Sequence, residues 1–221
     1  MTIKISNGVK RLFDIIVSFV GLVITALILA MIACLIKIAS SGPVFFKGER
    51  VGRNGKSFKI YKFRTMIVGA EKMGGPSTAS DDPRLTKIGK FLKRFQLDEL
   101  PQLINVLKGE MSLVGPRPEV PSVVELLTEK EKKIILPQKP GIVDLASIWD
   151  FNEGERLTGK IDPHKVYLEE IWPIKKKLQI YYIKNQNIWL DIRIILRTIF
   201  KIFHLNCFTI KIHVGEEVFN L

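Results

Sequence analysis

The stretch that decides the fold is residues 95–118, which read FQLDELPQLINVLKGEMSLVGPRP. Apolar side chains recur here at i, i+3, i+4 and i+7, and this period predicts a helix with one face on a core. Proline is tolerated only in a first helical turn, so Pro101 places the helix start close to Asp98 and Glu99. Gly109 is expected to end the helix. The apolar positions are Leu100, Leu103, Ile104 and Leu107.

Two adjacent carboxylates open this helix, and they have two readings. In the first, Asp98 and Glu99 only complement the positive end of the helix dipole. In the second they hold a cation, because neighbouring carboxylates repel each other and Mg²⁺ binds one or two carboxylates together with substrate phosphates. Lys93, Arg94 and Arg117 lie close by in the sequence, as a polyphosphate partner would require. These neighbouring basic residues favour the second interpretation, in which the carboxylates hold a cation.

The composition points to an anionic partner. The 221 residues suffice for one domain and an anchor, and they carry a net charge of +12. Basic and aromatic residues are not interleaved in any recognisable nucleic-acid module, so we expect phosphate and acidic membrane lipid rather than nucleic acid. Cys34 and Cys207 form no disulfide framework, which suits a reducing cytosol.

Residues 15–36 form an apolar run that predicts a membrane anchor. A helix of this length measures about 33 Å, enough to cross the hydrocarbon core of a bilayer. Cationic residues lie on both sides of the run, and the positive-inside rule therefore draws both flanks to the cytoplasm. A straight span cannot satisfy both flanks, whereas a re-entrant helix can. The simple span remains the alternative. The flanking cations are Lys4, Lys10, Arg11, Lys37, Lys47, Arg50 and Arg53.

Two short strands are expected at 44–46 and 58–64, joined through an Asn-Gly pair that is typical of a β-hairpin. Period two places Lys62 and Arg64 on one face of the second strand. The polar segment 69–82 has no periodicity and is expected to be a mobile surface loop, with a cover over the site as one role. Residues 120–135 predict one charged amphipathic helix.

From residue 167 on, the chain is expected to be helical and increasingly basic. Arg193, Arg197 and Lys201 recur at i, i+4 and i+8 among apolar residues, and we expect this face to lie in an anionic membrane surface. The alternative is a core helix with a solvated basic face. Residues 204–221 allow no prediction.

The motifs at 98–102 (DELPQ) and 115–118 (GPRP) together resemble those of the bacterial sugar transferases, the monotopic polyprenyl-phosphate phosphoglycosyl transferases. The resemblance covers residues 10–200. It implies a re-entrant N-terminal helix, which in the family is usually broken by Ser-Pro, whereas this chain has Thr25-Ala26. The family's Asp after Lys-Arg is kept, at Asp14.

The resemblance also implies roles for the candidate site residues. Asp98 would be the nucleophile that forms an aspartyl phosphosugar intermediate, and Glu99 the principal Mg²⁺ ligand beside it. Lys62 and Arg117 would bind phosphate, assisted by Lys93 or Arg94. Two departures stand out: Gly48 replaces a usual Gln, and 143–147 reads VDLAS where many relatives have TGLAQ. The second departure suggests a different sugar or nucleotide pocket.

We therefore expect a mostly helical α+β enzyme with a small antiparallel β-hairpin. The expected parts are a membrane-embedded helix at 1–41, a catalytic domain at 42–160, amphipathic membrane-interface helices at 161–203 and a tail at 204–221. The expected location is the bacterial inner membrane, with the catalytic domain on the cytoplasmic face.

The expected reaction moves a sugar 1-phosphate from a nucleotide diphosphate sugar, a UDP-sugar, to undecaprenyl phosphate at the start of glycan assembly. A non-catalytic membrane scaffold of the same fold is the alternative. Such a scaffold would not need Asp98, Glu99 and Arg117 together. The sugar and the oligomeric state stay open.

Overall fold

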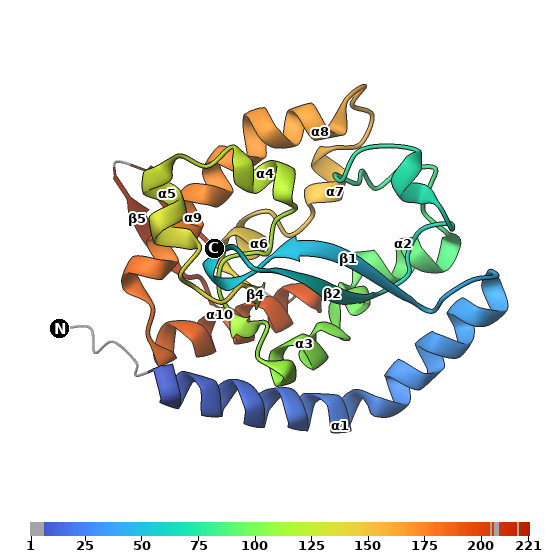
Figure 1. The fold of residues 1–221 in the computed structure, drawn as a ribbon, viewed down its shortest axis with the longest axis horizontal. Coiled ribbons are helices and arrows are strands. Elements are labelled where there is room, and N and C mark those ends of the chain that lie inside the picture. The colour runs from blue at the N-terminus through green and yellow to red at the C-terminus, as the bar shows by residue number, and fades with distance from the viewer. Residues whose placement is uncertain (1–6, 204, 206–207, 216) are drawn as a thin grey trace.

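The computed structural model describes residues 7–203, 205, 208–215 and 217–221. The described chain is mostly helical with three small two-stranded sheets, which confirms the predicted fold class. Figure 1 shows the long helix α1 along the lower edge of a domain built from the other elements. The remaining bounds that are not given below are η2 Ala70–Lys72, α4 Pro121–Glu125, α5 Glu129–Ile135, α7 Glu153–Arg156, α8 Pro163–Val166 and the π-helix η4 Tyr167–Ile171.

The central motif folds nearly as its pattern predicts. After α2 (Lys87–Arg94), a 3₁₀ turn η3 (Leu97–Glu99) carries the carboxylates, and α3 (Gln102–Lys108) follows with Pro101 as its N-cap residue. Gly109 ends α3 at a φ of 85°, a left-handed conformation that glycine adopts at little cost. The helix therefore starts slightly later than its carboxylates, which sit in the tighter turn before it.

The main core lies between this motif and the last helices. Strand β3 (Ser112–Val114) pairs in parallel with β4 (Gly141–Val143), and both strands pack against α10 (Ile188–Ile202) in a core shared with α6 (Leu145–Trp149) and α9 (Trp172–Asn185). Since β3 is buried along its whole length, the loop that follows it starts from a fixed point. The fully buried members of this core include Val106, Met111, Leu145, Ile148, Leu178 and Ile194.

The hairpin prediction is confirmed. Strands β1 (Phe45–Val51) and β2 (Ser57–Phe63) pair antiparallel, with Gly48 opposite Ile60, and Asn54 turns the chain at a φ of 58°. The single helix expected at 120–135 is instead two helices, α4 and α5. Thr128 separates them because its side chain forms a capping box with Glu131 and starts a new helix.

Helix α1 (Asn7–Ala39) is the one helix in the described chain that is long and apolar enough to cross a membrane. Its outer apolar side chains are exposed, while Asp14 and Ser18 point inward and are buried. The helix is continuous through residue 25, where the Thr25 hydroxyl donates to the Gly21 carbonyl at 2.7 Å. Hydrogen bonds of this kind bend helices, and α1 curves in Figure 1 without breaking.

Both ends of α1 are attached to the same domain. Near its N-terminus, Arg11 donates to the carbonyls of Val106 (2.6 Å) and Leu107 (2.9 Å) in the last turn of α3, where carbonyl groups lack partners within the helix ladder. At the other end, Arg64 of the hairpin donates to the Ser40 and Ser41 carbonyls that follow α1. Lys62 and Arg64, which were predicted to share one face of β2, therefore have different partners, and Arg64 holds the end of α1.

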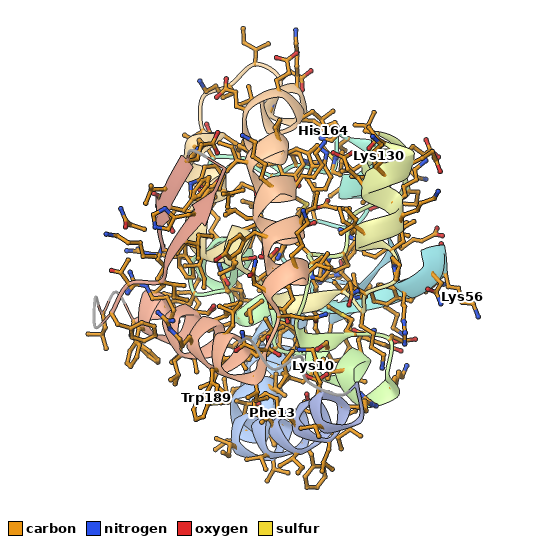
Figure 2. The ribbon with its side chains drawn as sticks, turned by 90° about the vertical axis from the view of Figure 1, so that its left-hand side faces the viewer. Lys10, Phe13, Lys56, Lys130, His164 and Trp189 are labelled. Atoms are coloured by element: carbon orange, nitrogen blue, oxygen red, sulfur yellow. The ribbon has the colours of Figure 1, made fainter. Side chains whose placement is uncertain are left out.

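The exposed apolar surface extends from α1 to α10. Figure 2 shows Phe13 and Trp189 at the lower edge, close to α1, whereas Lys130 and His164 lie at the opposite edge. Trp189 is 73% exposed, and Leu196 and Phe203 of the same helix are exposed too. These residues form the edge that suits a membrane interface.

The basic stripe predicted for α10 does not face solvent or lipid at two of its three positions, so that prediction is wrong there. Arg197 is buried, with 6% of its surface exposed, and its guanidinium carbon lies 6.0 Å from the ring centroid of Phe208. Lys201 donates to the carbonyl of Ile148. The physical reason is the C-terminal segment, since the hairpin of β5 (Lys211–Val214) and β6 (Glu217–Asn220) adds to the same core.

The polar segment 69–82 is organised around one buried arginine. Arg84 pairs with Asp82 at 2.7 Å and donates to the carbonyls of Ala70 and Gly75. The segment also bonds to α7, where the Ser80 amide donates to the Gly154 carbonyl at 2.8 Å. The sequence of this segment shows no long helical or strand period, because side-chain hydrogen bonds hold it together with one short 3₁₀ helix, η2.

Candidate active site

Three separate segments bring the predicted site residues together around Glu99. Its Oε1 atom accepts hydrogen bonds from Lys62 Nζ at 2.7 Å and from Arg117 Nη2 at 2.8 Å. Lys62 comes from β2, and Arg117 from the loop after the buried strand β3. One carboxylate oxygen is thus shared by a point charge and a forked guanidinium.

Asp98 lies beside this cluster in a different state. Asp98 is buried, with 7% of its surface exposed. Its carboxylate accepts no hydrogen bond from any residue that the structure describes. Burial raises the pKa of Asp98, and the charge of Glu99 raises it further, while Lys62 and Lys93 oppose the shift. A buried carboxylate without hydrogen bonds is a stronger nucleophile than a solvated one.

Glu99 is held firmly ionised. Burial alone would raise the pKa of Glu99, but Arg117 and Lys62 bring it well below its usual range. The same contact raises the pKa of Arg117, chiefly through the charge of Glu99. The two neighbouring carboxylates therefore have environments that push their pKa values apart, which is the pattern of side chains with different chemical roles.

The structure places Lys93 with the cluster and Arg94 away from it. Burial lowers the pKa of Lys93, and the charge of Asp98 opposes that shift. Helix α2, which carries Lys93, packs against the turn η3, which carries Asp98. Arg94 is exposed, with its guanidinium 5.8 Å from the ring centroid of Phe95. Lys93 and Arg94 are the last two residues of α2. Successive residues of a helix point about 100° apart, so their side chains leave the helix in different directions.

A second layer of charges was missed by the sequence reasoning. Tyr167 donates to Glu119 at 3.1 Å, and Lys175 pairs with Glu153 while lying 5.3 Å from the Tyr167 ring centroid. Burial lowers the pKa of Arg50, and the charge of Glu119 opposes that shift. Glu119 alone had a signal in the sequence, as it directly follows the GPRP motif.

The carboxylate pair fits a Mg²⁺ ion as a partial ligand set. Mg²⁺ commonly takes one or two carboxylates and completes its shell with water and substrate phosphate oxygens. The Asp98 carboxylate and the Glu99 Oε2 atom accept no hydrogen bonds from the described residues, so these oxygens stay available. The described residues contain no group of three or more acidic, His or Cys ligands, which excludes a closed structural metal cage among them.

The family model of the bacterial sugar transferases matches residues 5–205. The chain belongs to this family, as the two motifs predicted.

The chain is 42% identical over 201 residues to the UDP-glucose:undecaprenyl-phosphate glucose-1-phosphate transferase of Klebsiella pneumoniae, covering 88% of this chain and 41% of that protein. It is 34% identical over 194 residues to the UDP-N-acetylgalactosamine-undecaprenyl-phosphate N-acetylgalactosaminephosphotransferase of Aeromonas hydrophila, covering 86% and 43%. It is 38% identical over 202 residues to the exopolysaccharide production protein PSS of Rhizobium leguminosarum bv. phaseoli, covering 86% and 92%. The chain thus spans about two fifths of the first two relatives and nearly all of the third.

Proposed function

We propose that this chain transfers a sugar 1-phosphate from a UDP-sugar to undecaprenyl phosphate and releases UMP. The observation that carries the proposal is the pair of unlike carboxylates: Glu99 fixed by Lys62 and Arg117, and Asp98 buried beside it without a hydrogen bond. Relatives named for this transfer, to which the chain is 42% and 34% identical, support the choice of donor and acceptor.

In the proposed reaction, Lys62, Lys93 and Arg117 bind the diphosphate of the donor. An oxygen of Asp98 attacks the phosphorus next to the sugar, a P–O bond forms, and the P–O bond to UMP breaks with its electron pair leaving on UMP. A phosphate oxygen of the lipid then attacks the same phosphorus. The bond to Asp98 breaks, and the free carboxylate returns.

The cations suit this sequence because negative charge accumulates on the phosphoryl oxygens in both steps. When bound, a Mg²⁺ ion held by Glu99 and Asp98 would supply further charge neutralisation on the diphosphate. Glu99 also keeps Lys62 and Arg117 in place before the donor arrives, which lowers the cost of ordering them.

We further propose that α1 is embedded in one leaflet of the bacterial inner membrane and that the domain lies on the cytoplasmic face. The support is that Arg11 and Arg64 attach both ends of α1 to one domain. Both ends then lie on one side of the membrane, where soluble nucleotide sugars are found. An acceptor lipid that stays in the bilayer would meet the site at the headgroup level.

The direct test is a panel of UDP-sugars with undecaprenyl phosphate, scored by UMP release with and without Mg²⁺. We expect one or a few sugars to turn over, and excess chelator to abolish the release. Glu99→Gln should reduce turnover by at least about a hundredfold, since it removes the charge that holds Lys62 and Arg117. Absence of UMP release for every sugar would overturn the proposal, and full turnover in chelator would remove the metal.

A further inference from the structure

A groove with almost wholly apolar walls lies between α1 and α2. Its volume is about 230 Å³, and five of its six lining residues are apolar. Phe91 and Leu35, on opposite walls, are 57% and 53% exposed. Apolar side chains so exposed in a groove indicate a hydrocarbon occupant. The lining residues are Ile32, Leu35, Lys87, Ile88, Phe91 and Leu92.

The groove is connected to the candidate active site by a single helix. Helix α2 lines the groove from Lys87 to Leu92, and the next residue, Lys93, lies at the end of the helix that packs against η3, the turn that carries Asp98. Six residues of helix separate Lys87 from Lys93, a rise of about 9 Å. A molecule with its phosphate near Lys93 and its tail along α2 would therefore enter the groove directly. Figure 1 shows α2 above the C-terminal part of α1.

The charges along α2 match such a molecule. Lys87 and Lys90 are exposed, and they continue the positive charge of Lys93 along one helix. Ile88, Phe91 and Leu92 give the same helix an apolar side toward α1. An anionic head with a hydrocarbon tail complements a helix that is basic on one side and apolar on the other.

We propose that the groove between α1 and α2 holds the first isoprene units of the lipid acceptor. This assignment rests on the proposed function for the identity of the lipid. Branched isoprene units are bulkier than straight acyl chains, and branched or aromatic walls at Ile32, Ile88 and Phe91 pack well against them. The groove thus orients the acceptor phosphate toward Asp98.

The test is photo-crosslinking with a prenyl phosphate that carries a diazirine in its second isoprene unit. The full chain is held in phosphatidylcholine nanodiscs, and adducts are mapped by peptide mass spectrometry. We expect adducts on the peptides with Leu35 and Phe91, suppressed by undecaprenyl phosphate and not by an equal concentration of phosphatidic acid. Leu35→Trp fills the groove and should lower the adduct yield about tenfold, the effect of losing roughly two buried methylene groups.

Leu27→Trp is the matched control, since Leu27 is 74% exposed on the same helix and does not line the groove. Its yield should equal that of the wild type. Adducts spread evenly along α1, equal competition by phosphatidic acid, or an unaffected Leu35→Trp variant would each overturn the assignment. Adducts at the groove in a chain that releases UMP from no UDP-sugar would uphold the groove and refute the proposed function.

Discussion

Asp14, on the apolar helix α1, accepts a hydrogen bond at 3.1 Å from the backbone amide of Leu113, a residue of the buried strand β3. Because β3 leads through Gly115 and Pro116 to Arg117, helix α1 supports the strand that precedes a candidate site residue. Lys10, one turn earlier on α1, pairs with Asp191, which also accepts from Tyr182 at 2.6 Å. The apolar helix is thus part of the domain's interior as well as its anchor.

Asp14→Ala is therefore expected to destabilise the protein by about 1–3 kcal/mol, since the Leu113 amide would lose its buried acceptor. Asp14→Asn keeps an acceptor oxygen and should cost clearly less. Thermal unfolding in nanodiscs measures both variants. An alanine variant as stable as the wild type would show that the contact is dispensable.

Asp98→Asn is expected to abolish chemistry while leaving donor binding largely intact, because the amide keeps the shape of the carboxylate and loses its nucleophilicity. In the wild type, a UDP-sugar alone should release UMP in an amount no greater than the enzyme, and kinetics with lipid should be ping-pong. Quench-flow and intact-mass measurement of a sugar-phosphate adduct test this order. A requirement for lipid before any UMP appears would instead indicate direct transfer in a ternary complex.

Arg117→Lys is expected to lower kcat/KM at least about tenfold, since a single ammonium cannot replace a forked guanidinium that meets both Glu99 and a phosphate. Arg94→Lys is the matched control, because Arg94 is exposed and points away from the cluster. Steady-state kinetics with the preferred UDP-sugar compares the two. Equal losses in both variants would remove the special role of Arg117.

We expect the contribution of the Asp82–Arg84 pair to protein stability to be lost in acid. Hydrogen bonds from Arg84 lower the pKa of Asp82 below 3.8, its usual value. A lowered folded-state pKa contributes stability that is present above pH 3.8 and is lost as the pH falls through the folded-state value. Asp82→Asn should thus be less stable than the wild type at neutral pH, with the difference shrinking in acid. Urea unfolding from neutral pH down to acid measures it, and a constant difference would refute the linkage.

The proposed topology predicts that both flanks of α1 are closed to reagents applied outside the cell. Single cysteines at Asn7 and Ser57, in a variant without Cys34 and Cys207, should both resist an impermeant thiol reagent and both react after permeabilisation. Labelling at position 7 alone would establish a spanning helix.

Much of the candidate site could be predicted because it lies in local patterns. The helical period and Pro101 place Asp98 and Glu99 at a helix start, and the alternation of β2 separates Lys62 from its neighbours. The choice between Lys93 and Arg94 depended on where α2 turns its last residues, which only packing fixes. Tyr167 and Lys175 had no local signal, since they meet Glu119 and Glu153 across long separations in the sequence.

The prediction of an exposed basic stripe on α10 is wrong for a related reason. A helical period identifies residues that share a face, but it does not say whether a later segment covers that face. Here Arg197 is buried, and its guanidinium lies 6.0 Å from the ring centroid of Phe208, in the segment that follows α10. The curve of α1 likewise has no proline to mark it, and a threonine hydrogen bond to the helix backbone accompanies it instead.

The C-terminal hairpin has a practical consequence for protein engineering. The family match stops at residue 205, yet Ile210, Ile212 and Leu221 are buried in the main core, and Leu221 exchanges two backbone hydrogen bonds with Ile210. A truncation designed from the family boundary would strip this layer and leave an open apolar surface prone to aggregation. An affinity tag fused directly after Leu221 would need a flexible spacer, because the last side chain is itself packed inside.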